Sequence, residues 1–284
     1  MIVVGVDGSR VALEAVVWAV REAAIRDDTV RIVYAIPAWA YEMCEGPARA
    51  GMSRRMRDAM LDVLTVAVRR ARVESADVDV DSQLLPGDPP LVLIRTSKDA
   101  ELLVVGDHTG GNSHGLLGSV VPGVSSQATC PVAVVHTVPA RPRNEVVVGV
   151  DGSPGAQAAV EFAFAEAALR KAELHAVHAW DRDTAGCGAE GMPGLTQQAA
   201  VERRLLAEAV AGFGERYPDV KVVESTDQGH PVEVLRKASS AAGLLVVGSR
   251  GWGSGPALLL GSVSRMLLQR VICPLIVVAT ADTV

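Results

Sequence analysis

The sequence VGVDGS stands at residues 4–9 and again at residues 148–153, and this recurrence decides how the rest of the chain is interpreted. Three further segments recur in the same order at offsets of 142 to 143 residues: LLVVG at 102–106 and 244–248, LLGSV at 116–120 and 259–263, and CP at 130–131 and 273–274. Collinear matches at nearly one offset indicate a tandem duplication. We therefore expect two domains, residues 1–138 and 145–284, joined by a proline-containing linker at 139–144.

Each half alternates short apolar runs with stretches of helical periodicity. In the first half, the runs that predict strands lie at residues 2–6, 31–36, 78–84, 102–105 and 131–136. The stretches that predict helices lie at residues 11–26, 53–72, 89–97 and 120–128. This alternation favours an α/β fold in which helices cover both faces of a parallel sheet. We expect each half to be a doubly wound five-stranded parallel sheet of strand order 3-2-1-4-5.

The composition is that of a globular protein with a large aliphatic core. Of 284 residues, 49% are apolar and only 4% aromatic, so Val, Leu, Ile and Ala must fill the core, as in buried parallel sheets. The net charge is -6, and no basic stretch is present, which argues against nucleic acid and anionic membranes as partners. No apolar run approaches the roughly 18 residues that span a bilayer. The N-terminus enters a strand directly, so we expect no signal peptide.

The cysteines and histidines form no metal-binding pattern. Cys44, Cys130, Cys187 and Cys273 make neither a CxxC pair nor a zinc spacing. Four cysteines in a chain of this length do not form a disulfide scaffold, so we expect a reducing compartment, the cytoplasm. The six histidines include no HExxH motif, and we interpret them as structural or surface residues. We therefore expect no metal site built from these side chains.

A glycine-rich segment follows the fourth strand of the second half. It reads Gly248-Ser249-Arg250-Gly251, then nine residues, then Gly261-Ser262-Val263-Ser264. Glycines let a backbone approach phosphate oxygens closely, and the free N–H groups at the start of a helix attract an anion. The segment therefore indicates an anion-binding loop at the carboxyl edge of the sheet, where ligands bind in open α/β folds. A solvated connecting loop capped by serine stays open as the alternative.

The spacing G-x2-G-x9-G-[ST] resembles that of nucleotide-binding members of the universal stress protein family. The VGVDGS segments and the CP pairs before the fifth strands are also similar to that family, and the resemblance covers essentially the whole chain in two copies. Tandem members of this kind are typical of actinobacteria, which fits a chain with far more arginine than lysine. The resemblance implies an adenine nucleotide as the ligand: ATP, alone or with Mg²⁺, in a site shared by the first, second and fourth strands.

The resemblance also implies which residues of the second half contact ATP. Asp151 would face the adenine and ribose, Ala179 would offer backbone groups to the adenine, and Gly248 would lie near the ribose. The residues that would surround the phosphates are Gly251, Gly261, Ser262, Val263 and Ser264. Arg250 is either a further phosphate contact or a solvent-exposed side chain. For Asp151 the simpler interpretation is a turn residue in Asp-Gly-Ser, and both roles are compatible.

The first half keeps part of this pattern and loses part of it. The residues that match are Asp7, Ala35, Gly106, Gly118 and Ser119. Thr109 stands where the second glycine belongs, while Val121 lacks the hydroxyl of its serine counterpart and Pro122 lacks a backbone N–H. Asp107 also places a negative charge where the second half has Ser249. We therefore expect an intact site in the second half and a degraded one in the first.

Three functions stay open at this point: a nucleotide-dependent regulator of the stress response, a slow ATPase that uses the same site, and an interaction scaffold that binds no nucleotide. The glycine-rich segment argues against the scaffold. The lack of a Walker-type lysine and of a clear general base argues against the ATPase. The resemblance further implies that the halves pair through their fifth strands, 132–136 and 275–279, as an intrachain pseudo-dimer, and it allows a homodimer of whole chains.

Overall fold

In a computed structural model, the chain divides into two compact units, Met1–Thr137 and Val138–Val284. The structure describes residues 1–37, 40, 54–107, 120–136, 142–181, 195–251 and 260–279. The expected pairing of the two halves through their fifth strands stays a prediction, as does the homodimer.

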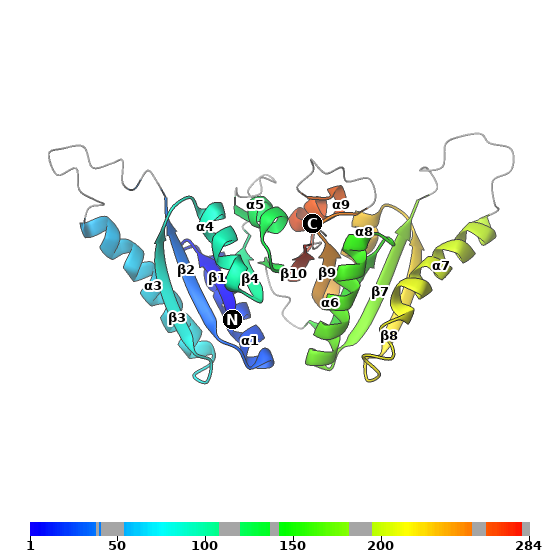
Figure 1. The fold of residues 1–284 in the computed structure, drawn as a ribbon, viewed down its shortest axis with the longest axis horizontal. Helices are drawn as coiled ribbons and strands as arrows, with labels where there is room; N and C mark the ends of the chain where they lie inside the picture. Colours follow the sequence, from blue (N-terminus) through cyan, green and yellow to red (C-terminus); the bar gives the residue numbers. More distant parts are fainter. Residues whose placement is uncertain are drawn as a thin grey trace. The chain divides into compact units, whose positions relative to one another are not determined.

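The first unit is a sheet of five parallel strands in the order β3-β2-β1-β4-β5 (Figure 1). The strands are β1 (Ile2–Val6), β2 (Val30–Ile36), β3 (Val80–Pro86), β4 (Leu102–Gly106) and β5 (Val132–Val135). The helices are α1 (Arg10–Arg26), α3 (Arg54–Glu74), α4 (Pro89–Thr96) and α5 (Val120–Gln127), with a short 3-10 turn at Ser97–Asp99. This arrangement confirms the predicted strand order 3-2-1-4-5.

The second unit repeats the arrangement, with parallel strands in the order β8-β7-β6-β9-β10. The strands are β6 (Arg143–Val150), β7 (Glu173–Trp180), β8 (Val222–Gln228), β9 (Ala242–Gly248) and β10 (Leu275–Val278). The helices are α6 (Pro154–Arg170), α7 (Leu195–Ala211), α8 (Pro231–Ala238) and α9 (Ser262–Arg270), with a 3-10 turn at Ser239–Ala241. Strand β6 begins inside the expected linker at 139–144, and its register against β9 shifts between Arg143 and Val146.

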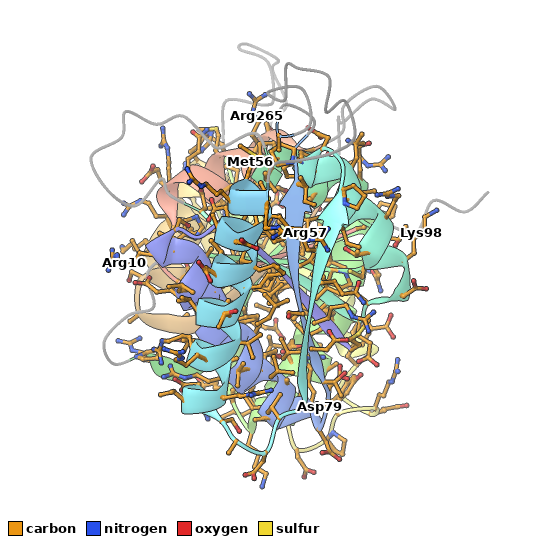
Figure 2. All side chains as sticks on the ribbon, turned by 90° about the vertical axis from the view of Figure 1, so that its left-hand side faces the viewer. Arg10, Met56, Arg57, Asp79, Lys98 and Arg265 are labelled. Carbon is orange, nitrogen blue, oxygen red and sulfur yellow. The ribbon has the colours of Figure 1, made fainter. Side chains whose placement is uncertain are left out.

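Helices cover both faces of each sheet, as right-handed crossovers between parallel strands require. In the first unit α1 packs against β1, β4 and α3, while α4 packs against β2 and α5. Figure 2 shows this layering: Met56 and Arg57 mark α3 on one side of the sheet, and Lys98 marks the other side. None of the helices in the described part of the chain is both long and apolar enough to span a bilayer.

The cores are aliphatic, as the composition predicts. Ile2, Val3 and Val4 are wholly buried in the central strand β1, and Val146–Val148 are wholly buried in β6. These strands read as continuous apolar runs because helices cover both of their faces. Burying each large aliphatic side chain contributes about 1.5–3 kcal/mol, so these strands contribute substantially to the stability of each unit.

Two cysteines occupy matching places in the two units. Cys130 and Cys273 precede the fifth strands, and both are buried. Burial raises the pKa of each thiol to about 11, because the thiolate loses its hydration. The thiolate is the reactive form of cysteine, so this environment favours a packing role for both side chains.

We expect neither Cys130 nor Cys273 to be alkylated by iodoacetamide in the folded protein at about pH 8. A thiol with a pKa of about 11 is ionised there to roughly one part in a thousand. Peptide mass spectrometry after brief alkylation measures each cysteine separately, and complete labelling in urea is the control. Rapid labelling of either cysteine in the folded protein would contradict the packing role.

Candidate functional site

The Asp-Gly-Ser turn at the end of β6 holds Asp151 at the carboxyl edge of the sheet. The Ser153 N–H donates to Asp151 Oδ1 at 2.9 Å, and Ser153 Oγ accepts from the Ala156 N–H at 3.1 Å, which caps α6. Gly152 has a φ of 76°, a conformation that favours glycine. The turn interpretation of Asp151 therefore holds, and it leaves Asp151 exposed at the sheet edge.

A cavity of about 160 Å³ opens at the carboxyl ends of β6, β7 and β9. Its apolar wall includes Val150, Val177, Leu235 and Val247. All nine residues singled out in the second half line it: Asp151, Ala179, Gly248, Arg250, Gly251, Gly261, Ser262, Val263 and Ser264. The fold thus brings these residues around one cavity, although Asp151 and Ser264 are 113 positions apart in the chain.

Two glycines lie in close approach to their neighbours here, and at Gly248 the neighbour is backbone. A Cβ on Gly248 would lie 2.6 Å from the carbonyl of Gly155, so the end of β9 touches the start of α6 backbone to backbone. A Cβ on Gly251 would collide with the carboxylate of Asp151. Close packing therefore requires glycine at position 248, which also lines the cavity. Gly251 lies directly against Asp151.

The start of α9 presents backbone donors to the cavity. Gly261 is the N-cap and has no side chain to satisfy the first turn, while its own N–H donates to the Ser249 carbonyl at 2.8 Å. The N–H groups of the first helical turn have no partner within a helix, and the helix end carries partial positive charge. Ser262 is exposed at this end, and Arg250 lines the same space. The arrangement is suited to an anion.

Ser264 has a different contact from the one that the resemblance implies. Its buried hydroxyl donates to the Gly248 carbonyl at 2.6 Å, so its proton is engaged with the end of β9. The Ser264 hydroxyl therefore joins α9 to the sheet in this structure, and only its backbone N–H belongs to the first helical turn. Val121 stands at the matching position of the first half, where no such hydroxyl is available.

His178 supports the end of β6, although no sequence motif marks it as a site residue. Its Nδ1 lies 2.7 Å from the Val150 carbonyl, which can only accept, so Nδ1 carries a proton. Its Nε2 lies 2.9 Å from Glu202 Oε2 on α7, and Gln198 donates to the same carboxylate. His178 is buried, which fits the structural interpretation of the histidines and connects α7 to the residue before Asp151.

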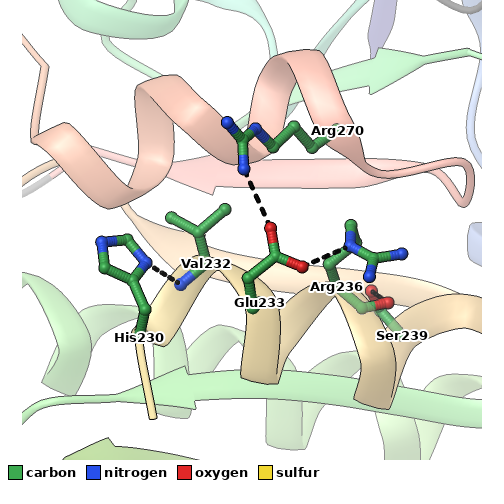
Figure 3. A network of polar contacts seen from close by, with 6 residues as sticks. All are labelled: His230, Val232, Glu233, Arg236, Ser239 and Arg270. Carbon is green, nitrogen blue, oxygen red and sulfur yellow. Dashed lines mark hydrogen bonds and ion pairs between the residues drawn. The ribbon is translucent and has the colours of Figure 1, made fainter. Parts of the chain in front are cut away.

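A surface network joins the two helices whose first turns border the cavity. Glu233 of α8 accepts from Arg236 at 3.0 Å and from Arg270 of α9 at 2.9 Å (Figure 3). The hydrogen bond from Arg236 and the charge of Arg270 lower the pKa of Glu233. Because these side chains are about half exposed, salt screens the network and its contribution to stability is small.

The first unit has a larger cavity, of about 480 Å³, at the matching edge. Asp7, Ala35 and Gly106 line it, as the resemblance implies. Gly118 and Ser119, and the substitution at Thr109, lie outside the described residues. Asp7 is held as Asp151 is, because the Ser9 N–H donates to its Oδ1 at 2.9 Å.

Asp107 does not line this cavity with its carboxylate, contrary to the expectation from its place in the loop. It is buried, and its Oδ2 lies 3.4 Å from His136 Nε2 at the end of β5. The pair joins the residues that follow β4 and β5. The Asp107 carboxylate therefore points into the unit and contacts His136, which the local sequence alone does not reveal.

The whole chain is similar to known proteins. The model of the universal stress protein family matches residues 1–136 and 142–279. Universal stress protein Rv2623 of Mycobacterium tuberculosis is 36% identical over 97% of this chain and 95% of its own length. A universal stress protein of Mycolicibacterium smegmatis is 34% identical over 98% and 96%. The crystal structure of a universal stress protein from Archaeoglobus fulgidus has a TM-score of 0.70 at 20% identity, over 99% and 96% of the two chains, which supports the fold.

We expect Glu202→Ala to lower the free energy of unfolding by about 1–3 kcal/mol, because the buried His178 ring loses a hydrogen-bond partner. Urea unfolding followed by circular dichroism measures the change. Glu208→Ala is the matched control, since Glu208 lies on the same helix with 64% of its side chain exposed. That variant should change stability by less than about 0.5 kcal/mol. Equal losses in both variants would contradict the supporting role of His178.

Proposed function

Because the chain belongs to the universal stress protein family along both of its halves, we propose that its second half binds ATP and that the protein acts as a nucleotide-dependent regulator in the stress response. One observation carries the binding proposal. The nine residues chosen from the sequence of the second half line a single cavity at the carboxyl edge of its sheet. Ligands of open α/β folds bind at this edge.

The phosphates are assigned to the start of α9. Backbone N–H groups of the first turn, the exposed Ser262 hydroxyl and the Arg250 guanidinium supply donors and positive charge there. The cavity of about 160 Å³ is smaller than the roughly 300–1,000 Å³ typical of small-molecule sites, so ATP would not be enclosed completely. Its terminal phosphates would lie at the solvent-exposed rim.

The adenine and ribose are assigned to the other end of the cavity. Val150, Val177, Leu235 and Val247 offer apolar surface to the ring. Asp151 has an exposed carboxylate that can accept hydrogen bonds from the ribose hydroxyls or the adenine amino group. Ala179 lies at the end of β7, where backbone groups face the same space.

Mg²⁺ fits this site as a companion of the phosphates. The described lining offers one carboxylate, Asp151, and no cluster of three metal-ligating side chains occurs among the described residues. Mg²⁺ keeps several waters and is commonly held by one or two carboxylates together with substrate phosphates. The chain's own contribution would therefore be Asp151, with the remaining ligands supplied by nucleotide and water.

We expect Gly261→Glu and Asp151→Ala each to weaken ATP binding at least tenfold, whereas Asp7→Ala should change it little. Glutamate at the α9 N-cap places a negative charge against the phosphates, and Asp151→Ala removes the acceptor for ribose. A lost hydrogen bond to a charged group costs about 1.5–3 kcal/mol, which is tenfold or more in affinity. Titration calorimetry of the three variants and the parent measures these changes.

The same titration counts the sites. One ATP per chain is the expected stoichiometry, because the first half has Thr109 in place of the second glycine and Val121 in place of Ser264. Two equivalent sites, or full binding by the Gly261→Glu variant, would overturn the assignment. Phosphate release measured over hours on the same samples distinguishes a slow ATPase from a protein that only binds the nucleotide.

A further inference from the structure

Helix α3 and the edge strand β3 form the sides of a groove on the surface of the first unit, and Figure 2 shows the two elements side by side. The groove has a volume of about 560 Å³. Leu61, Leu64 and Val68 of α3 and Leu84 of β3 supply its aliphatic wall. We propose that this groove is a docking site for an extended, acidic segment of a partner protein, which pairs as an added strand with the free edge of β3.

Helix α3 carries more apolar surface than its own packing uses. The residues that it buries are spaced as one helical face: Met60, Leu64, Ala67 and Ala71. Leu61 and Val73 lie at the margin of that face and line the groove, and they remain 41% and 74% exposed. Neighbouring exposed aliphatic side chains in a groove are typical of an interaction surface. An occupant with aliphatic side chains would remove this surface from water.

The strand beside the groove has an edge that can accept a further strand. β3 is the last strand of the sheet on its side and pairs only with β2 within the described residues. Such an edge presents backbone N–H and C=O groups to an incoming segment. Ser82 and Leu84 are two positions apart in β3 and both line the groove. A strand added at this edge would therefore place every second side chain in the same groove.

The groove is cationic, although the chain as a whole has a net charge of -6. Arg69 and Arg72 line it, both are exposed, and its described lining contains no acid. Within the described part of the chain, neither guanidinium takes part in an ion pair. α3 contains six arginines and three acids, whereas its counterpart α7 contains two of each. Because guanidinium groups bind carboxylates, the groove favours an acidic occupant.

The order of residues along the groove predicts the pattern of that occupant. Residues 75–79 join α3 to β3, so the end of the helix lies near the start of the strand. Arg69 and Arg72 therefore lie toward the start of β3, and Leu61 lies toward Leu84 near its end. The docked segment would place aliphatic side chains between Leu61 and Leu84 and carboxylates against the two arginines.

The acids beside the groove argue for a narrow occupant and against an anionic lipid surface. Asp77, Asp79 and Asp81 follow α3 and are exposed, and Asp79 marks the start of β3 in Figure 2. A flat anionic surface that reached Arg72 would also meet these carboxylates, which would repel it. A single strand contacts only the groove.

The test uses the isotope-labelled full chain and two peptides that match β3 in length, because either strand direction satisfies the edge. Their sequences are Leu-Thr-Val-Thr-Glu-Thr-Glu and its reverse. We expect at least one of them, at concentrations up to about 1 mM, to shift the NMR amide resonances of β3 and α3. The same peptide with Lys in place of Glu should bind at least about tenfold more weakly, because its charges are repelled.

Backbone pairing is tested with the same peptide carrying N-methyl groups on alternate amides, in each of the two possible patterns. In an added strand, alternate amides point toward β3 and away from it. We therefore expect one pattern to abolish binding and the other to preserve it. Binding by both patterns would contradict strand addition.

Two charge reversals test the role of the arginines. Arg69→Glu and Arg72→Glu should each weaken the Glu peptide at least about fivefold and should favour the Lys peptide. Arg203→Glu is the matched control, since Arg203 is exposed on α7 and changes the net charge equally. It should leave the affinity unchanged. Thermal unfolding followed by circular dichroism verifies that each variant folds, and the Lys peptide provides a gain of binding that misfolding would not produce.

Several results would overturn the proposal. They are no resonance shift with either peptide, shifts confined to other elements, equal binding of the Glu and Lys peptides, or equal losses in Arg72→Glu and Arg203→Glu. Sedimentation with phosphatidylglycerol vesicles that Arg72→Glu abolishes would assign the face to a lipid surface instead. Self-association of the parent chain that Arg72→Glu abolishes in sedimentation velocity would assign it to a second copy. ATP titration of the same variants tests the proposed function separately.

Discussion

The contact between the end of the fourth strand and the start of the first helix is the constraint on which each site depends. A Cβ on Gly248 would come 2.6 Å from Gly155, and a Cβ on Gly106 would come 2.8 Å from Val11. Only glycine permits this approach, and it brings the Asp-Gly-Ser turn beside the residues that leave the fourth strand. The position of each cavity is therefore a property of the backbone, established before any ligand contact is considered.

On this shared backbone the two halves carry different chemistry. The second unit joins α9 to β9 through the Ser264 hydroxyl, and the charged residues in the described lining of its cavity are Asp151 and Arg250. The first unit has Val121 at the matching position and pairs Asp107 with His136 inside the unit, and the charged residues in the described lining of its cavity are Asp7 and Asp88. Residues at strand ends and loops can diverge in this way because the core does not depend on them.

The polar contacts around the site differ in how much they contribute to stability. His178 is buried and bonded on both ring nitrogens, so removing a partner leaves a polar group without water. Glu233 and its two arginines lie at the surface, where water and salt weaken the attraction. The first kind of contact positions the strand end that carries Asp151, and the second adds little to the stability of the helix pair.

Much of the architecture follows from the sequence by itself. The duplication and the alternation of strands and helices were predictable, because periodicity and turn chemistry act between neighbours in the chain. The strand order followed from the rules for doubly wound parallel sheets. Bounds differ by a few residues, as for β3 at Val80–Pro86 against the expected 78–84, since pairing with β2 decides where a strand ends. The nine residues of the second-half cavity were found from motif spacing and family resemblance.

Only the tertiary structure decided how individual polar side chains are used. The Ser264 hydroxyl bonds to Gly248, His178 bonds to Glu202, and Asp107 turns toward His136. Each partner lies 16 or more residues away in the chain. Local patterns place a residue on an element, but a buried hydrogen bond depends on which elements pack together and how closely. That choice is made by packing of the whole unit, and so it is not encoded in any one stretch of the sequence.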